Sequence, residues 1–396
     1  MFGRFKSFFR LPESKSSRSA RLIALESGGR ARWTPHDYGA LAREGYARNA
    51  IVYRAVRLIA ESIGALSFVL YEGSDEHDTH PLLDLIKRPN PRQDGASLLE
   101  SIASHLLLAG NAYVEAVGPG GEAMQVRELY ALRPDRMKLV PGPDGWPQAY
   151  EYTVAGSTVR FNQNAVLPPI LHLTLFNPLD DHYGLSPLEA AATAVDTHNA
   201  AANWNKALLD NAARPSGALI YDAAEGAILS AQQYERIKRE FADQYQGRGN
   251  AGRPLLLEGG LDWKPMSLTP KELDFLEAKH AAAREIALAF GVPPMLLAIP
   301  GDNTYSNYQE ANRVFWRQSV LPLASRIACA LTHWLAPAFG ERLVLTADLD
   351  RIEALSPDRA ALWERVSKAP FLSVNEKRLA TGYGPIEGGD VFRAPH

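Results

Sequence analysis

The chain has 396 residues, of which 46% are apolar and 22% charged, which is typical of folded soluble proteins with two or three domains. Its formal net charge of −3 argues against a dedicated high-affinity duplex binder, because such proteins gather lysine and arginine on one face. The single cysteine, Cys329, excludes an intramolecular disulfide and a thiolate metal cluster, and we expect it to be a small buried residue. The apolar stretch 165–176 contains two prolines and is too short to cross a bilayer.

The N-terminal half begins with a basic stretch and continues into mixed helices and strands. Residues 1–21 carry six basic side chains against Glu13 alone, which favours a basic arm or a solvated tail over a cleaved signal. Apolar spacing predicts a helix over 49–64 and a strand over 66–71. A helix should follow from a capping box of Ser97 and Glu100 to Gly110. Further strands are expected at 113–117, 127–132, 137–140, 150–154, 158–161 and 166–175, with a hairpin turn at 155–156.

The middle of the chain predicts two helices that carry a small module. Ser186, Pro187 and Glu189 form a complete helix start, so an alanine-rich helix should run from Pro187 to about residue 213. Another helix should begin at residue 230 and continue through 245. Short strands are expected at 255–257 and 263–268, before a further helix over 271–290. This order places a short β-bearing excursion between two helices.

A polar loop separates that last helix from a longer one. Gly291 and the prolines after it should end the helix over 271–290. The small polar residues of 301–307 predict a loop. Ser306 and Gln309 indicate a capping box for a long helix up to residue 336, with a kink expected near Pro322. A strand over 342–349, a helix over 357–368 and a capping box at Ser373 and Glu376 complete the chain.

The motifs of common catalytic sites are missing or incomplete. Ser186 lacks the final glycine of a nucleophile elbow and is better explained as a helix cap. His172 alternates with apolar residues, which favours a hydrogen-bonded core histidine over a ligand. The group 180–182 could hold a cation, but a polar turn is favoured. We therefore predict neither a metal site nor a cofactor. Two alternative functions stay open, a soluble hydrolase that uses Ser186 or the group 180–182, and a helical adaptor without a channel.

Several segments, taken together, resemble the portal proteins of tailed bacteriophages and of phage-derived gene transfer agents. They are GNAYVEAV from Gly110, LYALRPDRM from Leu129, HYGLSPLEAA from His182, NAARPSGALI from Asn211, AGRPLLLEGGLDWKPMSLTPKELDFLEAKH from Ala251, IALAFGVPPMLL from Ile286, NTYSNYQEA from Asn303 and LSVNEKRLATGYGPIEGGD from Leu372. Each segment alone is a weak signal, whereas their joint order between residues 49 and 390 is specific.

The resemblance implies an α+β portal fold of wing, stem, clip and crown, assembled as a ring of usually twelve subunits around a DNA channel. It places the wing at 22–229, the first stem helix at 230–246, the clip at 247–270 and the second stem helix at 271–292. The tunnel loop and long wing helix would occupy 293–336, and the crown 337–396. The clip and crown are shorter than in many portals, which leaves the extent of the adaptor surface open.

The resemblance also implies a function and a set of partners. The ring would sit at one capsid vertex of a virion or phage-like particle made in the bacterial cytoplasm, where DNA is packaged and later ejected. The expected partners are further copies of the chain, double-stranded DNA without sequence specificity, the large terminase subunit, the major capsid protein and a head-tail adaptor protein, with no membrane. The ATPase would belong to the terminase, so this chain is not expected to be an enzyme.

Three groups of residues are expected to make these contacts. The tunnel-loop residues expected to face DNA are Asp302, Asn303, Thr304, Tyr305 and Asn307. The stem charges expected to face the channel or a neighbouring subunit are Arg236, Lys238, Lys279 and Arg284, with ordinary solvated helix charges as the alternative. The clip residues expected to dock the terminase or the adaptor are Arg248, Arg253, Glu258 and Trp263.

Overall fold

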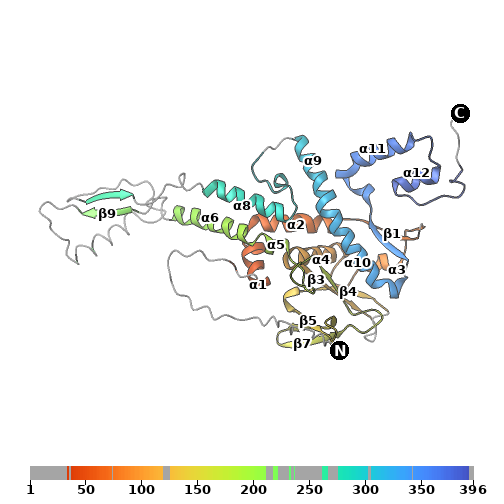
Figure 1. The fold of residues 1–396 in the computed structure, drawn as a ribbon, viewed down its shortest axis with the longest axis horizontal. Coiled ribbons are helices and arrows are strands. Elements are labelled where there is room, and N and C mark those ends of the chain that lie inside the picture. The colour runs from red at the N-terminus through yellow and green to blue at the C-terminus, as the bar shows by residue number, and fades with distance from the viewer. Residues whose placement is uncertain are drawn as a thin grey trace, which may run out of the picture. The chain divides into compact units, whose positions relative to one another are not determined.

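The computed structural model describes residues 34–391 apart from 35–36, 74, 119–124, 211–216, 222–231, 233–235, 237–260, 266–274, 302–304 and 341. The basic arm expected at 1–21 therefore lies outside the described residues. The helices are α1 Tyr38–Leu41, α2 Ala50–Gly64, α3 Pro81–Lys87, α4 Gly95–Ala109, α5 Pro187–Ala190, α6 Ala192–Asp210, α8 Phe275–Ala289, α9 Tyr305–Phe315, α10 Leu321–Phe339, α11 Ser356–Ser367 and α12 Val374–Thr381 (Figure 1). Within these residues, no helix combines the length and apolar content that crossing a bilayer requires.

The strands pair in antiparallel ladders. They are β1 Phe68–Glu72, β2 Asp75–His77, β3 Asn111–Val117, β4 Glu128–Leu132, β5 Met137–Pro141, β6 Pro147–Val154, β7 Ser157–Asn162, β8 Ile170–Thr174, β9 Gly217–Tyr221, β10 Leu261–Pro265 and β11 Leu343–Ala347. The pairing orders are β11-β1-β2, β4-β3-β8, β5-β6-β7 and β10-β9. The turn predicted at 155–156 is confirmed, because Ala155 and Gly156 have φ of 49° and 85°, as a tight hairpin turn requires.

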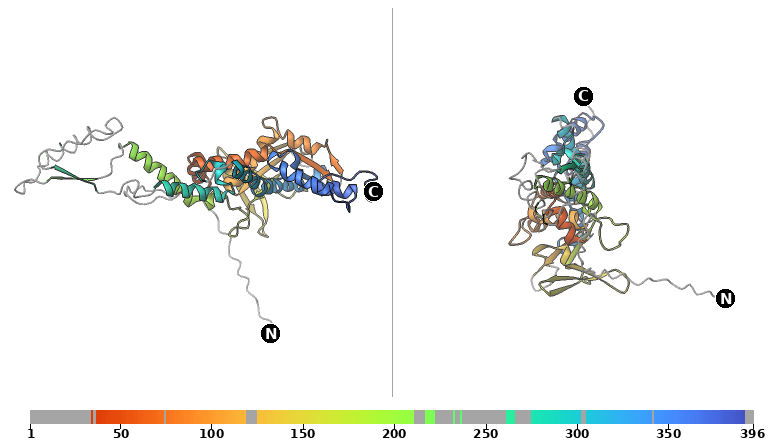
Figure 2. Two further views of the ribbon diagram at one scale, coloured as in Figure 1. Left: turned by 90° about the horizontal axis from the view of Figure 1, so that it is seen from above. Right: turned by 90° about the vertical axis from the view of Figure 1, so that its left-hand side faces the viewer.

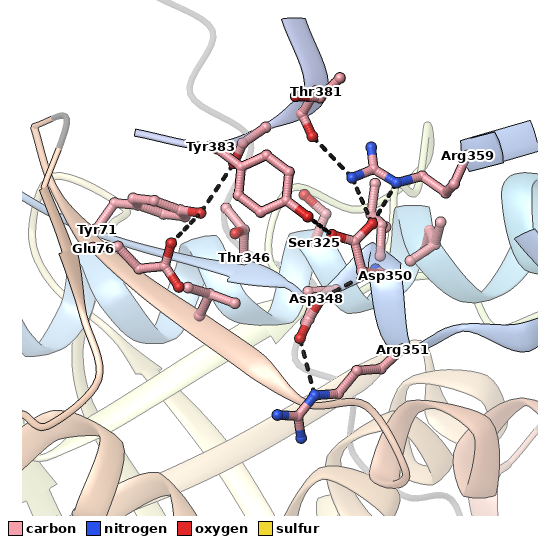
Figure 3. Close-up of a pocket in the computed structure, with 15 residues that line it drawn as sticks. Tyr71, Glu76, Ser325, Thr346, Asp348, Asp350, Arg351, Arg359, Thr381 and Tyr383 are labelled. Carbon is pink, nitrogen blue, oxygen red and sulfur yellow. Dashed lines mark hydrogen bonds and ion pairs between the residues drawn. The ribbon is translucent and has the colours of Figure 1, made fainter. Parts of the chain in front are cut away.

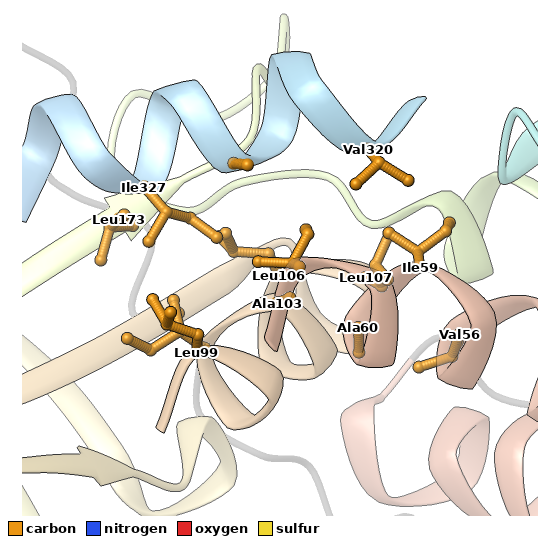
Figure 4. Close-up of a cluster of buried hydrophobic side chains, with 14 of the residues drawn as sticks. Val56, Ile59, Ala60, Leu99, Ala103, Leu106, Leu107, Leu173, Val320 and Ile327 are labelled. Carbon is orange, nitrogen blue, oxygen red and sulfur yellow. The ribbon is translucent and has the colours of Figure 1, made fainter. Parts of the chain in front are cut away.

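The main core lies where α2, α4 and the long α9–α10 segment meet. Val56 and Ile59 of α2 pack near Leu106 of α4, while Val320 and Ile327 approach from the long segment (Figure 4). All five side chains are at most 1% exposed. The apolar spacing that predicted the helix over 49–64 is the stripe that enters this core, and Asn49 caps the helix.

Two of the predicted capping sites are confirmed and two are wrong. Ser186 accepts from the N–H of Glu189, and Ser373 forms a reciprocal capping box with Glu376. The helix predicted to start at Ser97 instead has Asp94 as its N-cap, whose side chain accepts from the N–H of Ser97 at 2.8 Å. A serine three residues into a helix also satisfies the sequence pattern, so Asp94 was overlooked.

The long helix also begins earlier than predicted and is not continuous. α9 starts at Tyr305, so Ser306 lies in its first turn instead of at the N-cap. A π-helical turn over Trp316–Val320 stands directly before α10, and Pro322, near which a kink was predicted, lies in the first turn of α10. The prediction that Cys329 is buried is wrong. Ile327, Ala328 and Leu331 face the core, and Cys329 falls on the opposite side of α10.

Candidate functional site

Helices α6 and α8 lie side by side, with the β9–β10 ladder between them in the chain (Figure 2). In this ladder Trp263 pairs with Leu219 and Pro265 with Gly217. β9 therefore follows α6 in the chain, β10 precedes α8, and the two strands pair with each other. The excursion predicted after residue 246 lies almost entirely outside the described residues, and the described helix that packs along α8 is α6.

Most residues expected on the first stem helix and the clip lie outside the described part of the chain. These are Lys238, Arg248, Arg253 and Glu258. Arg236 is described as an exposed helical residue. Trp263 lies on β10, where it pairs with Leu219 of β9.

A buried polar network fixes α6 to the start of α2. Asn49 is 1% exposed and caps α2, because its Oδ1 accepts from the N–H groups of Ile51 and Val52. The Asn49 amide donates to Asn199 Oδ1 at 3.0 Å and lies 3.2 Å from His198 Nδ1. His198 Nδ1 must then be an acceptor, which requires the neutral ring. Burial lowers the pKa of His198, and the positive charge of the half-buried Lys279 on α8 lowers it further.

Arg284 connects α8 to the beginning of the polar loop. The exposed guanidinium donates to the carbonyl oxygen of Pro300. Just before this point, Leu297 and Ile299 are 7% and 3% exposed, so the chain leaves a buried anchor immediately before the loop. This contact gives Arg284 a structural role that the sequence did not reveal, in addition to the exposed charge that was expected there.

The loop leads into α9, whose side chains from residue 306 to residue 310 are all exposed. Asp302, Asn303 and Thr304 lie outside the described residues, and Tyr305 is the first residue of α9. Asn307 lies in the first turn, and each residue from 306 to 310 is exposed. Exposed side chains at a helix end can contact another molecule.

The serine considered for hydrolysis and the histidine considered as a ligand are both satisfied by structural contacts. Ser186 is 2% exposed and serves as a cap. His172 is stacked on Tyr113, lies 3.1 Å from the hydroxyl of Tyr150 and 3.0 Å from Asn111 Oδ1, and burial lowers its pKa to about 4. The prediction of a hydrogen-bonded core histidine is confirmed.

The group at 180–182 forms the expected polar turn. Asp180 Oδ1 accepts from the N–H groups of His182 and Tyr183, at 2.9 and 3.0 Å. The described residues also contain no group of three or more His, Cys, Asp or Glu side chains suited to a metal ion.

A cavity of about 620 Å³ lies between the β1–β11 edge, α10 and the C-terminal helices (Figure 3). Its central charge is Asp350, which accepts from Arg359 at 2.5 Å and from the hydroxyl of Tyr383 at 2.8 Å. Asp348 pairs with Arg351 at 3.1 Å. These paired charges hold the C-terminal helices against the β1–β11 edge. Among the residues that line the cavity, no nucleophile lies beside a base.

Two sequence motifs meet at a close backbone contact beside the sheet. The Gly110 carbonyl accepts from the N–H of Leu175 at 2.8 Å. A Cβ on Gly184 would lie 2.1 Å from the same carbonyl, and one on Gly110 would lie 2.4 Å from the Gly184 carbonyl. The glycines of GNAYVEAV and HYGLSPLEAA are therefore required because no side chain fits where the backbone at Gly184 passes the backbone at Gly110.

These features are those of a structural subunit whose exposed surfaces include helix faces and a loop. Over residues 50–382 the chain matches the family described as phage portal protein. An uncharacterized protein of Rickettsia bellii is 42% identical over 88% of this chain and 90% of its own length. The portal protein of Enterobacteria phage HK97 is 26% identical over 86% of this chain and 80% of its own length. The chain therefore belongs to the phage portal protein family.

Solved structures agree with this assignment and with the predicted mixed fold. A chain from the neck of a native gene transfer agent particle, computed with C12 symmetry, is 51% identical, with a TM-score of 0.68 and coverage of 92% of this chain and 99% of that one. An HK97-family portal protein from Corynebacterium diphtheriae is 17% identical, with a TM-score of 0.58 and coverage of 81% and 99%, which supports the fold alone.

Proposed function

We propose that this protein is the portal subunit of a phage-like particle of the gene transfer agent kind. Twelve copies would form a ring at one capsid vertex, through which DNA is packaged and later ejected. The observation that carries this proposal is the 51% identity to a chain in a C12-symmetric gene transfer agent neck, over 99% of that chain. A closed ring repeats the same side chains around its axis. Contacts of these side chains with the DNA backbone would carry no sequence information, which suits a channel that passes any DNA.

The paired helices α6 and α8 are the proposed stem. This assignment moves the first stem helix from residues 230–246 to 192–210, because α6 is the described helix that packs along α8. The excursion between them, with the β9–β10 ladder as its root, is then the proposed clip, which would dock the large terminase subunit and later the head-tail adaptor. The clip would therefore be longer than the 247–270 expected from the sequence.

The proposed DNA-facing element is the loop 301–304 with the first turn of α9. Its support is the exposure of every residue from 306 to 310, together with the attachment of the loop entrance by Arg284. The contacts would be short-range and polar, because the chain's net charge of −3 does not favour tight phosphate binding. The wing would contact the major capsid protein. The chain itself would perform no catalysis, and the terminase would supply the ATP hydrolysis.

Complementation in a strain that produces the particles tests this function. Without this chain, particles should contain no nuclease-protected DNA, and expression of the wild-type chain should restore it. Replacement of residues 302–304 by glycine and serine should leave particles assembled but reduce the protected DNA. Protected DNA at the wild-type level in the absence of the chain would contradict the proposal.

A further inference from the structure

The last part of the described chain is a helical hairpin with almost no apolar core of its own. On α11 the buried residue is Val366, and on α12 it is the polar Asn375. These helices have 12 and 8 residues, which is marginal for helices without tertiary packing. Large apolar side chains nevertheless occur throughout the segment and are exposed. They are Trp363 at 44%, Phe371 at 71%, Val374 at 46%, Leu379 at 74%, Ile386 at 47% and Val391 at 64%.

Polar contacts, which contribute little in water, hold this hairpin to the rest of the chain. Arg313 and Arg317 pair with Asp358 at 3.1 and 3.7 Å. Asp350 receives Arg359 and Tyr383 in the cavity of Figure 3. No residue after Leu345 belongs to the main buried apolar cluster of the described chain. Partly exposed ion pairs such as these contribute little individually, so the apolar burial that would stabilise the hairpin is missing from the described part of the single chain.

The hairpin is not loosely built, because Asn375 organises the loop that follows it. Its amide donates to the Ile386 carbonyl at 3.1 Å and to Asp390 at 2.9 Å, and its Oδ1 accepts from the N–H of Ile386 at 2.8 Å. A Cβ on Gly389 would lie 2.2 Å from Asn375 Oδ1, so the glycine permits this contact. The segment LSVNEKRLATGYGPIEGGD therefore presents exposed apolar side chains on an ordered frame, which favours binding.

The charge of the segment indicates what covers it. Residues 349–391 hold seven acidic and six basic side chains, a net charge of −1 with both signs interspersed. Nucleic acid would require a positive surface, and so would an anionic lipid surface. A nearly neutral apolar surface suits a protein, and a ring would place an identical hairpin beside each copy.

We propose that the α11–α12 hairpin is completed by the neighbouring copy of this chain, whose surface covers Phe371, Leu379 and the apolar side chains around them. This inference rests on the proposed ring. The contact would be heterologous, with one side of each hairpin against a different surface of the next copy, because a cyclic ring of more than two subunits requires such contacts. The hairpin would then be fully stable only in the assembled ring.

Thiol labelling of purified rings tests the proposal. In a Cys329→Ser background, Leu379→Cys and Phe371→Cys would be compared with Ser157→Cys, an exposed control on the β6–β7 hairpin. In rings isolated by size, we expect a maleimide to label the two hairpin positions at least about tenfold more slowly than the control, as for a side chain buried in an interface. In dissociated subunits the three rates should be similar. Equal rates in intact rings would overturn the proposal while leaving the portal function in place.

A matched pair of substitutions provides a second measurement. Leu379→Asp should raise the protein concentration at which rings form by at least about tenfold, whereas Leu379→Met should leave it nearly unchanged. Circular dichroism of both variants checks that the subunits are folded. Rings of Leu379→Asp that form at the wild-type concentration would overturn the proposal. If the wild-type protein forms no rings either alone or with its capsid protein, the portal function itself fails, and the hairpin loses its proposed partner with it.

Discussion

Asn49 joins the start of α2 to α6, and the substitution Asn49→Asp separates its two roles. One carboxylate oxygen can still accept from the N–H groups of Ile51 and Val52, so the helix cap is retained. The other oxygen replaces the amide nitrogen that lies 3.0 Å from Asn199 Oδ1 and 3.2 Å from His198 Nδ1. An acceptor would then face two acceptors in a buried site.

The expected cost follows from the groups left without a donor. Unsatisfied buried acceptors cost about 1–3 kcal/mol each, so we expect Asn49→Asp to lower the free energy of unfolding by about that amount at pH 8. Asn49→Ala also loses the cap and should be less stable still, by about 1 kcal/mol. Urea titrations of the three proteins in the same assembly state would measure these differences.

The pH dependence distinguishes this explanation from a simple loss of packing. In the wild type, burial and the charge of Lys279 lower the pKa of His198, so its contribution is full above the ordinary histidine pKa and is lost as pH falls through the lowered value. In Asn49→Asp, a carboxylate beside Nδ1 should raise that pKa. The resulting stabilisation is present below the ordinary pKa and is lost as pH rises through the raised value. Acidification from pH 8 to pH 6 should therefore reduce the difference in the free energy of unfolding between Asn49→Asp and wild type.

Two results would refute this reasoning. One is a difference in the free energy of unfolding between Asn49→Asp and wild type that stays constant between pH 8 and pH 6. The other is an Asn49→Ala variant as stable as Asn49→Asp at pH 8, since the cap would then contribute nothing.

Three further substitutions test other parts of the structure. Gly184→Ala should destabilise the fold by about 1–3 kcal/mol or more, because the new methyl group meets the Gly110 carbonyl and the two backbone segments must separate; a thermal shift below 1 °C would contradict this. Ser186→Ala should cost about 1 kcal/mol in urea titrations and leave DNA packaging intact, whereas a catalytic serine would abolish the activity. Asp350→Asn weakens the attachment of Arg359 and should speed hydrogen exchange in residues 356–383 without changing exchange in α2; unchanged exchange in α11 would show that the pair does not hold the hairpin.

Local signals in the sequence predicted the parts of the fold that depend on local physics. Apolar spacing located α2, because its buried stripe is continuous. The positive φ required at residues 155–156 and at Gly110 located a turn and a helix end. Cap positions were harder, since Asp94 and Ser97 both suit a helix start and the chain uses the earlier one.

The remaining features depend on contacts between segments far apart in the chain. Among the described helices, α6 packs along α8 although more than sixty residues separate the two, whereas the helix predicted at 230–246 lies almost entirely outside the described residues. The hydrogen bond from Arg284 to Pro300 uses a backbone carbonyl group. Because every residue has such a group, the sequence does not indicate which one Arg284 contacts. The exposure of Cys329 depends on which face of α10 turns inward, and a helix with apolar residues on more than one face leaves this ambiguous.

The central claim, that this chain forms a ring around a DNA channel, is tested most directly by electron microscopy of the purified full-length protein. The account predicts annular particles with an axial hole wide enough for duplex DNA, in which α6 and α8 and the loop before α9 line the hole. Rings whose channel is lined by other elements would contradict the assignment of the stem. A protein that stays monomeric or dimeric at high concentration, both alone and with its capsid protein, would contradict the claim itself.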